Sequence, residues 1–544
     1  MGDSSHCHKL FTILFFWGLV NSASASADSR RVDKHPLAEI NIYNTTLALR
    51  DSVAIRASPF VLGSKIKISF FKCQESSSTC PAVNNKDKEP YLCTSPIKFK
   101  YTNSSKSYSK TGKAVLKFQL INQRADFSFA LFSGGLSNGE DAEWVTVYLI
   151  NPNPSADDWV AVFSPAKFNV EGISQRLLLW CIRYTYKMGH RIRLSDGSFI
   201  WSKIYSFRSS PYPGHDSLQR VLIMGDLGKA ERDGSNEYAD YQPGSLNTTD
   251  QLIKDLDNID IVFHIGDLAY ANGYISQWDQ FVSQVEPIAS AVPYMVASGN
   301  HERTWPDSGG FYQGTDSGGE CGVTAETLFY VPAENRAKFW YSTDYGMFRF
   351  CIADSEHDWR EGSEQYKFLE RCLASADRRK QPWLIFAAHR PFGYSSNEWF
   401  AEEGAYEEPM GRDDLQKLWQ KYRVDIAFFG HVHNYERTCP IYQNTCVKSG
   451  TSHYSGVVNG TIHIVTGGGG SHLSAFATEI PNWSLFRDYD FGYTKLTAFN
   501  HSSLLFEHMK SSDGKVYDSF TISREYMDVL ACVHDSCAPS TLAA

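Results

Sequence analysis

Residues 261–274 read IVFHIGDLAYANGY, and this stretch decides the fold of the second half of the chain. Its first five residues are apolar and β-prone, and they end abruptly in Gly266-Asp267. Segments with helical periodicity at 247–256 and 364–377 separate this run from others of the same kind. The alternation of apolar strands and helices predicts an α/β layered domain. Four further apolar runs also end in polar residues, namely RVLIM (220–224), VPYMVAS (292–298), WLIFAA (383–388) and DIAFF (425–429).

The polar residues at the ends of these runs are the candidate functional side chains. Because the carboxyl ends of parallel strands meet at one edge of a sheet, we expect these side chains to lie close together. They are Asp226, Asp267, Tyr270, Asn300, His389, His431 and His433. Each motif alone is also common in ordinary structure, since a Gly-Asp pair after a strand usually forms a turn. Five strand ends of this kind, one after another along the chain, favour a shared site.

The donor chemistry of these residues indicates two metal ions. Carboxylate, phenolate, amide and imidazole are hard or borderline donors, which suit iron, manganese or zinc. Seven side chains exceed the needs of one ion, and one carboxylate can bridge two ions. Two-metal sites of this kind clamp the oxygens of an in-line displacement at phosphorus. The sequence contains no Cys/His signature and no Walker-type glycine loop that would favour another chemistry.

The ordered motifs as a set resemble those of the purple acid phosphatases, and specifically the large plant type. The resemblance extends over residues 221–526, and related sequences are often described as inactive or as diphosphonucleotide phosphatase/phosphodiesterases. It implies a layered β-sandwich metallophosphoesterase domain with helices outside, preceded by an all-β, fibronectin-like region. The motifs are GDLG (225–228), GDLAY (266–270), GNHE (299–302), FAAH (386–389) and GHVH (430–433).

The resemblance also implies how two metal ions would share the candidate ligands. A ferric ion (Fe3+) would be held by Asp226, Asp267, Tyr270 and His433. A divalent ion (Zn2+, Mn2+ or Fe2+) would be held by Asp267, Asn300, His389 and His431. Asp267 would therefore bridge the pair.

Tyr270 and His301 receive specific roles from the same resemblance. The wider superfamily has a histidine ligand where this chain has Gly228, and the Tyr270 phenolate would replace it. Phenolate bound to ferric iron gives such proteins their colour. His301 would be catalytic and, with Asn300, would bind the substrate phosphate. The implied reaction is that of an acid phosphatase, in which metal-bound hydroxide attacks a phosphate monoester.

The stretch after His389 departs from the family pattern. Residues 390–411 read RPFGYSSNEWFAEEGAYEEPMG, with several carboxylates and no histidine, where well-studied plant members carry further histidines. The carboxylates would repel a phosphate dianion, and the missing imidazoles remove candidate acids. Three hypotheses therefore stay open: a phosphatase for small phosphorylated substrates, a nucleotide pyrophosphatase/phosphodiesterase with a larger cleft, and a metal-binding but catalytically inactive glycoprotein.

The first half of the chain has an all-β pattern. Alternating runs such as KIKISFF (65–71) and FSFALFSG (127–134) predict an antiparallel β-sandwich over residues 28–169. Residues 170–213 contain RYTYKMG and FIWSKIYSF, one hairpin by pattern, and resemble only the end of a second fibronectin-like domain. The other boundaries are expected at 1–27 for a leader, 214–526 for the catalytic domain and 527–544 for a tail.

Several features predict export. Lys9 precedes an apolar stretch that is too short to span a bilayer, and small residues follow it, which is typical of a secretory signal peptide. Eleven cysteines follow this leader, so one is left unpaired, and Cys181 is the candidate. Four close pairs suit local disulfides, namely Cys73/Cys80, Cys351/Cys372, Cys439/Cys446 and Cys532/Cys537. N-glycosylation sequons occur at Asn44, Asn103, Asn247, Asn459, Asn482 and Asn500.

We therefore expect a secreted glycoprotein, destined for the extracellular space, the cell wall or the vacuole. A net charge of −9 without any long basic run argues against nucleic-acid binding. After the leader, no apolar run is long enough for a membrane anchor. Homodimers are frequent in the plant family, so the resemblance also allows a homodimer.

Overall fold

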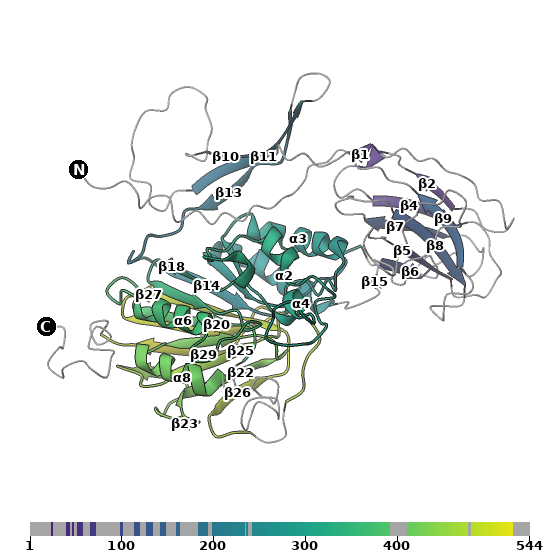
Figure 1. The fold of residues 1–544 in the computed structure, drawn as a ribbon. Coiled ribbons are helices and arrows are strands. Elements are labelled where there is room, and N and C mark those ends of the chain that lie inside the picture. The colour runs from purple at the N-terminus through teal and green to yellow at the C-terminus, as the bar shows by residue number, and fades with distance from the viewer. Residues whose placement is uncertain are drawn as a thin grey trace, which may run out of the picture.

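The computed structural model describes residues 201–233, 242–391, 411–476 and 480–525, together with individual β-strands elsewhere. The histidine-free stretch at 392–410 lies outside the described residues, as do the cysteine pairs Cys73/Cys80 and Cys532/Cys537. Cys181 and the sequon residues Asn44 and Asn103 also lie outside them. Figure 1 shows the ribbon with its elements labelled.

The strands that precede residue 150 pair antiparallel, as predicted. One sheet has the order β2-β4-β7, with bounds Ile40–Tyr43, Ser52–Ala57 and Ala114–Gln119. A second has the order β15-β6-β5-β8-β9, with bounds Asn236–Glu237, Lys98–Tyr101, Ile66–Phe71, Phe127–Ser133 and Ala142–Val147. A short pair joins β1 (Ala23–Ser24) to β3 (Thr46–Leu47). The strands between residues 28 and 169 agree with the predicted all-β region, whereas β1 and β15 lie outside its predicted bounds.

A four-stranded antiparallel sheet follows where the sequence indicated one hairpin. Strand β11 (Arg183–Arg193) is its centre, because it pairs with β10 (Trp159–Phe163), β12 (Phe199–Trp201) and β13 (Tyr205–Arg208). The local pattern could not show that β10, which lies before residue 170, joins this sheet.

Two tyrosines fasten this sheet to helix α3 (Ile275–Ala289). The Tyr186 hydroxyl donates to the Ser290 carbonyl oxygen at 3.0 Å, and the Tyr205 hydroxyl donates to Oε1 of Glu286 at 2.9 Å.

The second half of the chain folds into two large mixed sheets. The seven-stranded sheet has the order β17-β16-β14-β27-β28-β29-β24, in which β14, β16 and β17 are parallel neighbours. Its strand bounds are Tyr294–Ala297, Ile261–Ile265, Gln219–Met224, Gly492–Asn500, Ser503–Lys510, Val516–Ser523 and His453–Ser455.

The eight-stranded sheet has the order β18-β19-β20-β21-β25-β22-β23, with β26 also paired to β22. Strands β19, β20, β21 and β25 are parallel neighbours. Its strand bounds are Tyr341–Tyr345, Phe348–Ile352, Trp383–Ala388, Ile426–Phe429, Thr461–Thr466, Tyr435–Tyr442, Thr445–Cys446 and Ser484–Asp488.

The two sheets pack face to face over one apolar core. The rings of Phe263 and Phe350, from different sheets, lie 4.2 Å apart between centroids. Alternate side chains of strand β20 point to opposite faces of the sheet, and all of them are buried. Trp383, Ile385 and Ala387 belong to the core between the sheets, whereas the alternate side chains of the strand pack beneath two helices. This is the predicted layered β-sandwich with helices outside.

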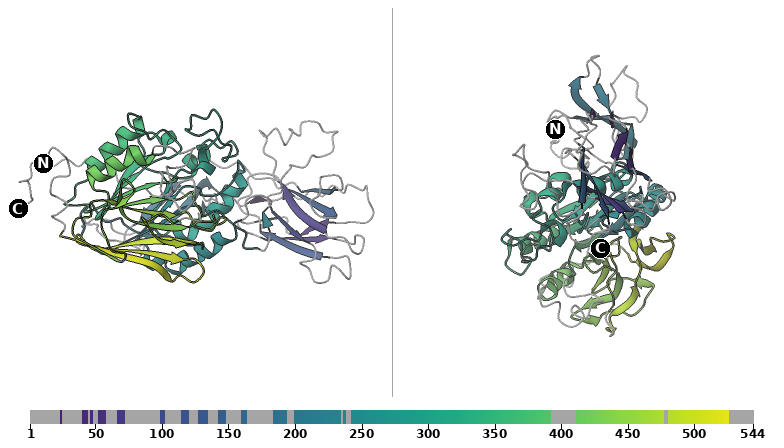
Figure 2. Two further views of the ribbon diagram at one scale, coloured as in Figure 1. Left: turned by 90° about the horizontal axis from the view of Figure 1, so that it is seen from below. Right: turned by 90° about the vertical axis from the view of Figure 1, so that its right-hand side faces the viewer.

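Helices α6 (Glu364–Ala374) and α8 (Gly411–Tyr422) cover the outer face of the eight-stranded sheet. The ring of Trp419 lies 5.1 Å from that of Phe386. Figure 2 shows these helices and the C-terminal strands on opposite sides of the domain. Helix α6 begins where predicted, since the Ser363 hydroxyl accepts from the Tyr366 amide at 3.1 Å, but it ends before residue 377.

Shorter helices complete the described part. The helix predicted at 247–256 is α2, which spans Gly244–Lys254 and leads into the 3-10 turn η3 (Leu256–Asn258). The others are α4 (Asn300–Arg303), α5 (Val323–Leu328) and the 3-10 turn η4 (Arg336–Lys338). None of the helices in the described part of the chain has the length and apolar character that a membrane crossing requires.

Two of the four predicted disulfides lie in the described part, and both are formed. Cys351–Cys372 ties β19 to α6, and Cys439–Cys446 ties β22 to β23. Cys321 is a free thiol within the same residues. The sequon residues Asn247, Asn459, Asn482 and Asn500 are all exposed.

Candidate metal centre

All seven predicted ligand residues gather where the motif strands end. The strands belong to two sheets, since β14, β16 and β17 lie in one and β20 and β21 in the other. The site therefore lies between the sheets, whereas the sequence suggested a single sheet edge. The donor atoms form two groups, Asp226/Asp267/His433 and Asp267/His389/His431, and within each group they lie within 4.8 Å of one another. Asp267 is common to both groups.

The backbone turns sharply at four of these residues. Asp226, Asp267, Tyr270 and His431 have φ values of 60°, 51°, 48° and 66°. A non-glycine residue in this left-handed region costs on the order of 1–3 kcal/mol, and such strain collects at functional sites. The turns direct the polar side chains into the space between the sheets.

Two glycines leave room for the ligand side chains. Gly266 has φ +92°, and a Cβ there would lie 2.6 Å from Nδ1 of His389. A Cβ at Gly299 would lie 2.3 Å from Oδ1 of Asp267. Larger residues at these positions would displace the ligands, so these motif glycines are required by the site itself.

One half of the centre is built by Asp226, Tyr270 and His433. The Tyr270 hydroxyl lies 3.3 Å from Oδ1 of Asp226 and 3.1 Å from Nε2 of His433. The distance from His433 Nε2 to the same carboxylate oxygen is 3.2 Å. The other oxygen of Asp226, Oδ2, accepts from the His431 amide at 2.8 Å. Together with Asp267, these are the residues that the resemblance assigned to a ferric ion.

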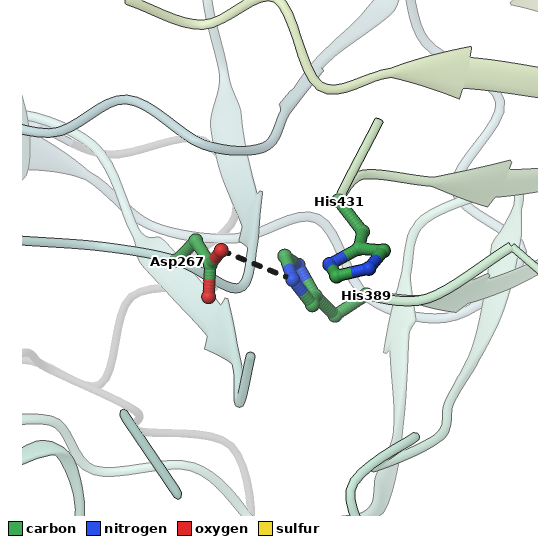
Figure 3. A group of neighbouring side chains, drawn as sticks. All are labelled: Asp267, His389 and His431. Atoms are coloured by element: carbon green, nitrogen blue, oxygen red, sulfur yellow. Dashed lines mark ion pairs between the residues drawn. The ribbon is translucent and has the colours of Figure 1, made fainter. Parts of the chain in front are cut away.

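The other half is built by Asp267, Asn300, His389 and His431. Figure 3 shows the His389 ring between the Asp267 carboxylate and the His431 ring. His389 Nε2 lies 3.3 Å from Oδ2 of Asp267, and it lies 3.0 Å from Oδ1 of Asn300. The same Asn300 oxygen lies 3.0 Å from Nδ1 of His431. These are the residues that the resemblance assigned to a divalent ion.

Hydrogen bonds to backbone carbonyl oxygens determine which ring nitrogen of two histidines faces the centre. Nδ1 of His389 contacts the Ile265 carbonyl oxygen at 3.0 Å, and Nδ1 of His433 contacts the His472 carbonyl oxygen at 2.8 Å. Carbonyls only accept, so each Nδ1 carries a proton, and Nε2 is the nitrogen left to bind a cation. His389 Nε2 faces oxygens of Asp267 and Asn300, and His433 Nε2 faces an oxygen of Asp226 and the Tyr270 hydroxyl. A metal ion bound between these nitrogens and oxygens fits this arrangement.

Electrostatics support the same conclusion. Burial opposes charge on His389, yet the carboxylates of Asp267 and Asp226 raise the pKa of its imidazole to about 10. Burial likewise opposes charge on His433, and Asp226 raises its pKa. Burial and the two carboxylates raise the pKa of Tyr270 well above its usual value, so its phenol loses a proton only to a strong cation. The two buried carboxylates therefore attract positive charge to this place.

His301 lies beside these groups. Its ring centroid is 4.3 Å from that of Tyr270, and its backbone amide donates to Oδ1 of Asp267 at 2.9 Å. Its buried Nδ1 has no hydrogen-bond partner among the described residues. The imidazole therefore has bonding capacity to spare at the site.

Glu302 has a role that the sequence did not reveal, although it stands in the GNHE motif. Its carboxylate is fully buried and accepts three backbone N–H groups, from Asp267 at 2.9 Å, Leu268 at 2.8 Å and Gly299 at 3.0 Å. Burial and the neighbouring Asp267 raise the pKa of Glu302 to about 8. Glu302 thereby joins two of the motif turns.

Arg390 and Glu356 form a second network that the sequence missed. Arg390 Nε donates to Oε1 of Glu356 at 2.7 Å, and Nη2 donates to Oε2 at 3.2 Å. The guanidinium lies 4.1 Å from the centroid of the Tyr312 ring, and Nη1 is 3.5 Å from Nε2 of His431. A buried cation therefore stands beside the centre. Its position next to His389 was the only sequence signal.

Comparisons with known proteins agree with this geometry. A model described as calcineurin-like phosphoesterase matches residues 219–435. An Fn3-like domain from purple acid phosphatase matches residues 56–139 and 136–180, and an iron/zinc purple acid phosphatase-like protein C model matches 460–519.

Named relatives cover most of the chain. "Probable inactive purple acid phosphatase 27" of Arabidopsis thaliana is 57% identical, covering 98% of this chain and 99% of that protein. "Nucleotide pyrophosphatase/phosphodiesterase" of Hordeum vulgare is 72% identical over 64% of this chain and 95% of that protein. A solved purple acid phosphatase, PPD1 from yellow lupin seeds, superimposes with a TM-score of 0.77 at 53% identity, covering 91% of this chain and 97% of its own.

The fold and the paired ligand groups define a metallophosphoesterase of the calcineurin-like class. Within that class, the chain belongs to the purple acid phosphatase family. The Arabidopsis alignment runs over 610 positions against the 544 residues of this chain, so at least 66 aligned positions have no residue here. The shortening at residues 170–213 stays a prediction.

Proposed function

We propose that this protein is a binuclear acid phosphatase that hydrolyses phosphate monoesters. The observation that carries the proposal is the convergence of two donor groups on a shared Asp267, with the Nε2 atoms of His389 and His433 aimed at carboxylate oxygens. Asp226, Asp267, Tyr270 and His433 would hold Fe3+, and Asp267, Asn300, His389 and His431 would hold Zn2+, Mn2+ or Fe2+. Such a pair of ions supplies positive charge and an activated water nucleophile.

The chain's own residues would orient the substrate and keep the site in shape. His301, with its spare Nδ1 beside Tyr270, would contact the phosphate and assist the leaving group. Asn300 would contact the phosphate as well. Glu302 would keep Asp267 in place through three backbone hydrogen bonds.

A second candidate is hydrolysis of nucleotide pyrophosphates and phosphodiesters. The observation in its favour is the 72% identity with the barley protein of that name. The two functions differ in whether the site admits a second ester group. A third candidate, a metal-binding but inactive protein, is supported by the names of relatives such as the 57% identical Arabidopsis protein.

The test is a paired assay on protein reconstituted with iron and zinc, from about pH 4 to about pH 8. One substrate is p-nitrophenyl phosphate, a monoester, and the other is bis(p-nitrophenyl) phosphate, a diester. Faster monoester turnover with an acidic optimum supports the proposal, and faster diester turnover supports the second candidate. Hydrolysis must disappear in Asp267→Ala. Absence of turnover in a protein that holds both metals would leave the inactive alternative.

We also propose that the protein is exported and glycosylated. The proposal is supported by the leader pattern at residues 1–27, by two disulfides and by four exposed sequon asparagines. Expression of the full chain in a eukaryotic host should give medium-borne protein whose mass falls on treatment with an N-glycosidase. Retention inside the cell without glycans would contradict it.

A further inference from the structure

Asn300 depends on one orientation of its side-chain amide. Its Oδ1 lies 3.0 Å from His389 Nε2 and 3.0 Å from His431 Nδ1. A flipped amide would present its NH2 group to the divalent-metal position, and an NH2 group cannot bind a cation. The family motif supplies the asparagine but does not explain what holds it this way round.

Asp316 is the group that distinguishes the two orientations. The Asn300 Nδ2 group donates to Oδ2 of Asp316 at 3.0 Å. An ionised carboxylate accepts hydrogen bonds but donates none. In the flipped orientation the Asn300 oxygen would face this carboxylate, and two acceptors would repel each other. The carboxylate therefore selects the orientation that turns Oδ1 toward the histidines.

The loop that carries Asp316 is itself held on both sides. The Ser317 amide donates to the Thr304 carbonyl oxygen at 3.1 Å, directly beside Asp316. Further along, the Glu320 carboxylate accepts from the Gly273 amide at 3.0 Å and from Nε1 of Trp278 at 2.7 Å. These bonds fasten the loop to the segment that follows Tyr270. Asp316 therefore has a fixed position from which to hold Asn300.

We propose that Asp316 is a positioning residue that fixes the Asn300 amide with Oδ1 toward the divalent-metal position and thereby sets the affinity for that metal. The inference rests on the proposed two-metal site and adds a residue outside its ligand set. It concerns the divalent position alone, because Asn300 is not among the ligands assigned to iron.

The test measures the two metals separately in the full-length protein. Protein carrying ferric iron is titrated with Zn2+ in a competition assay with a chelator, and the visible absorption band reports the iron half. In Asp316→Ala we expect ~10–100-fold weaker zinc binding with an unchanged band, which is the typical cost of removing a group behind a metal ligand. In Asp316→Asn the amide oxygen can still accept from Asn300, but the new NH2 group can donate to a flipped Asn300, so only part of the affinity should return.

Asp307→Asn is the matched control, because Asp307 is an exposed aspartate in the same loop. It should bind zinc as the wild type does. Zinc affinity of Asp316→Ala equal to that of a two-metal wild type would overturn the inference alone. Equal loss of both metals in Asp316→Ala and Asp316→Asn would also overturn it, since the residue would then only hold the loop together. If the wild-type protein did not bind a second metal, the proposed function itself would be wrong.

Discussion

The hydroxyl of Tyr270 lies 3.1 Å from Nε2 of His433, although 163 residues separate them in the chain. Tyr270 follows β16 of the seven-stranded sheet, and His433 follows β21 of the eight-stranded sheet. Both atoms face the same oxygen of Asp226. One half of the candidate centre therefore forms only when the two sheets pack together.

Replacing Tyr270 by phenylalanine should remove the colour of the iron-loaded protein. The change deletes the single oxygen that contacts Asp226 and His433 and keeps the ring, so packing is preserved. We expect loss of the broad visible band and a fall in iron affinity of at least ~10–100-fold, the range seen even for residues behind metal ligands. Absorption spectra measure the visible band, and the metal content of matched samples measures the loss of iron.

Tyr294→Phe is the control for Tyr270→Phe. Tyr294 is equally buried, and its hydroxyl bonds Nδ1 of His264 at 2.9 Å within the core. Removal of this hydroxyl should leave the visible absorption band intact. If Tyr270→Phe kept its colour, the assignment of Tyr270 to the ferric ion would be wrong.

The strands of the catalytic domain could be predicted from the sequence because burial dictates their composition. β20 and β21 are buried on both faces, so they read as uninterrupted apolar runs, and β16 departs from this only at the buried His264. Their distribution between two sheets could not be read in the same way. Side-chain pattern reports burial, and it does not identify the neighbouring strand.

The candidate ligands could be predicted because each follows a strand in a short motif. Asp316 could not, since it lies in an irregular loop and acts only through Asn300. The same holds for Glu356, which meets Arg390 through tertiary packing. Local sequence carries no trace of such contacts, so the groups that hold the ligands emerge only from the folded structure.

Gly299→Ala should disturb the centre without a charge change. The new Cβ would lie 2.3 Å from Oδ1 of Asp267 and 2.5 Å from its backbone nitrogen, so the bridging residue must move. Crowding of this kind costs ~1–3 kcal/mol of unfolding free energy. We expect reduced binding of both metals, measured by metal content after dialysis. Gly310→Ala, whose nearest contact would be 3.5 Å, should bind both as the wild type does.

Asp425→Asn should lower stability at neutral pH. Its carboxylate is 2.6 Å from Nη1 of Arg524 and 3.4 Å from Nη2 of Arg378, and it accepts from the Leu384 amide at 2.8 Å. The loss should be ~3–5 kcal/mol, because two buried guanidinium groups would lose their counter-ion. Urea unfolding measures it. The exposed pair of Asp358 and Arg360 is the contrast, where Asp358→Asn should cost less than ~1 kcal/mol.

The effect of Asp425→Asn should depend on pH in one direction. Burial opposes its charge, but Arg524 and Arg378 hold the pKa of Asp425 below its usual value in the folded protein. Its stabilisation is therefore complete above the unfolded pKa of ~3.9 and is lost as pH falls through the lower folded pKa. In metal-free protein, the difference in unfolding free energy between wild type and Asp425→Asn should shrink below about pH 4. A constant difference at all pH values would show that the ion pair is not its source.

The Cys351–Cys372 disulfide should stabilise the catalytic domain independently of the metals. It joins β19 to α6 across 21 residues of sequence, and both cysteines are buried in the core beneath the helices. Closing a loop of that length restricts the unfolded chain and contributes ~3 kcal/mol. The double variant Cys351→Ala/Cys372→Ala should therefore unfold at a lower urea concentration while the folded protein keeps its visible band. Loss of the band under native conditions would instead show that this disulfide maintains the metal centre, since β20, which ends at His389, is the parallel neighbour of β19.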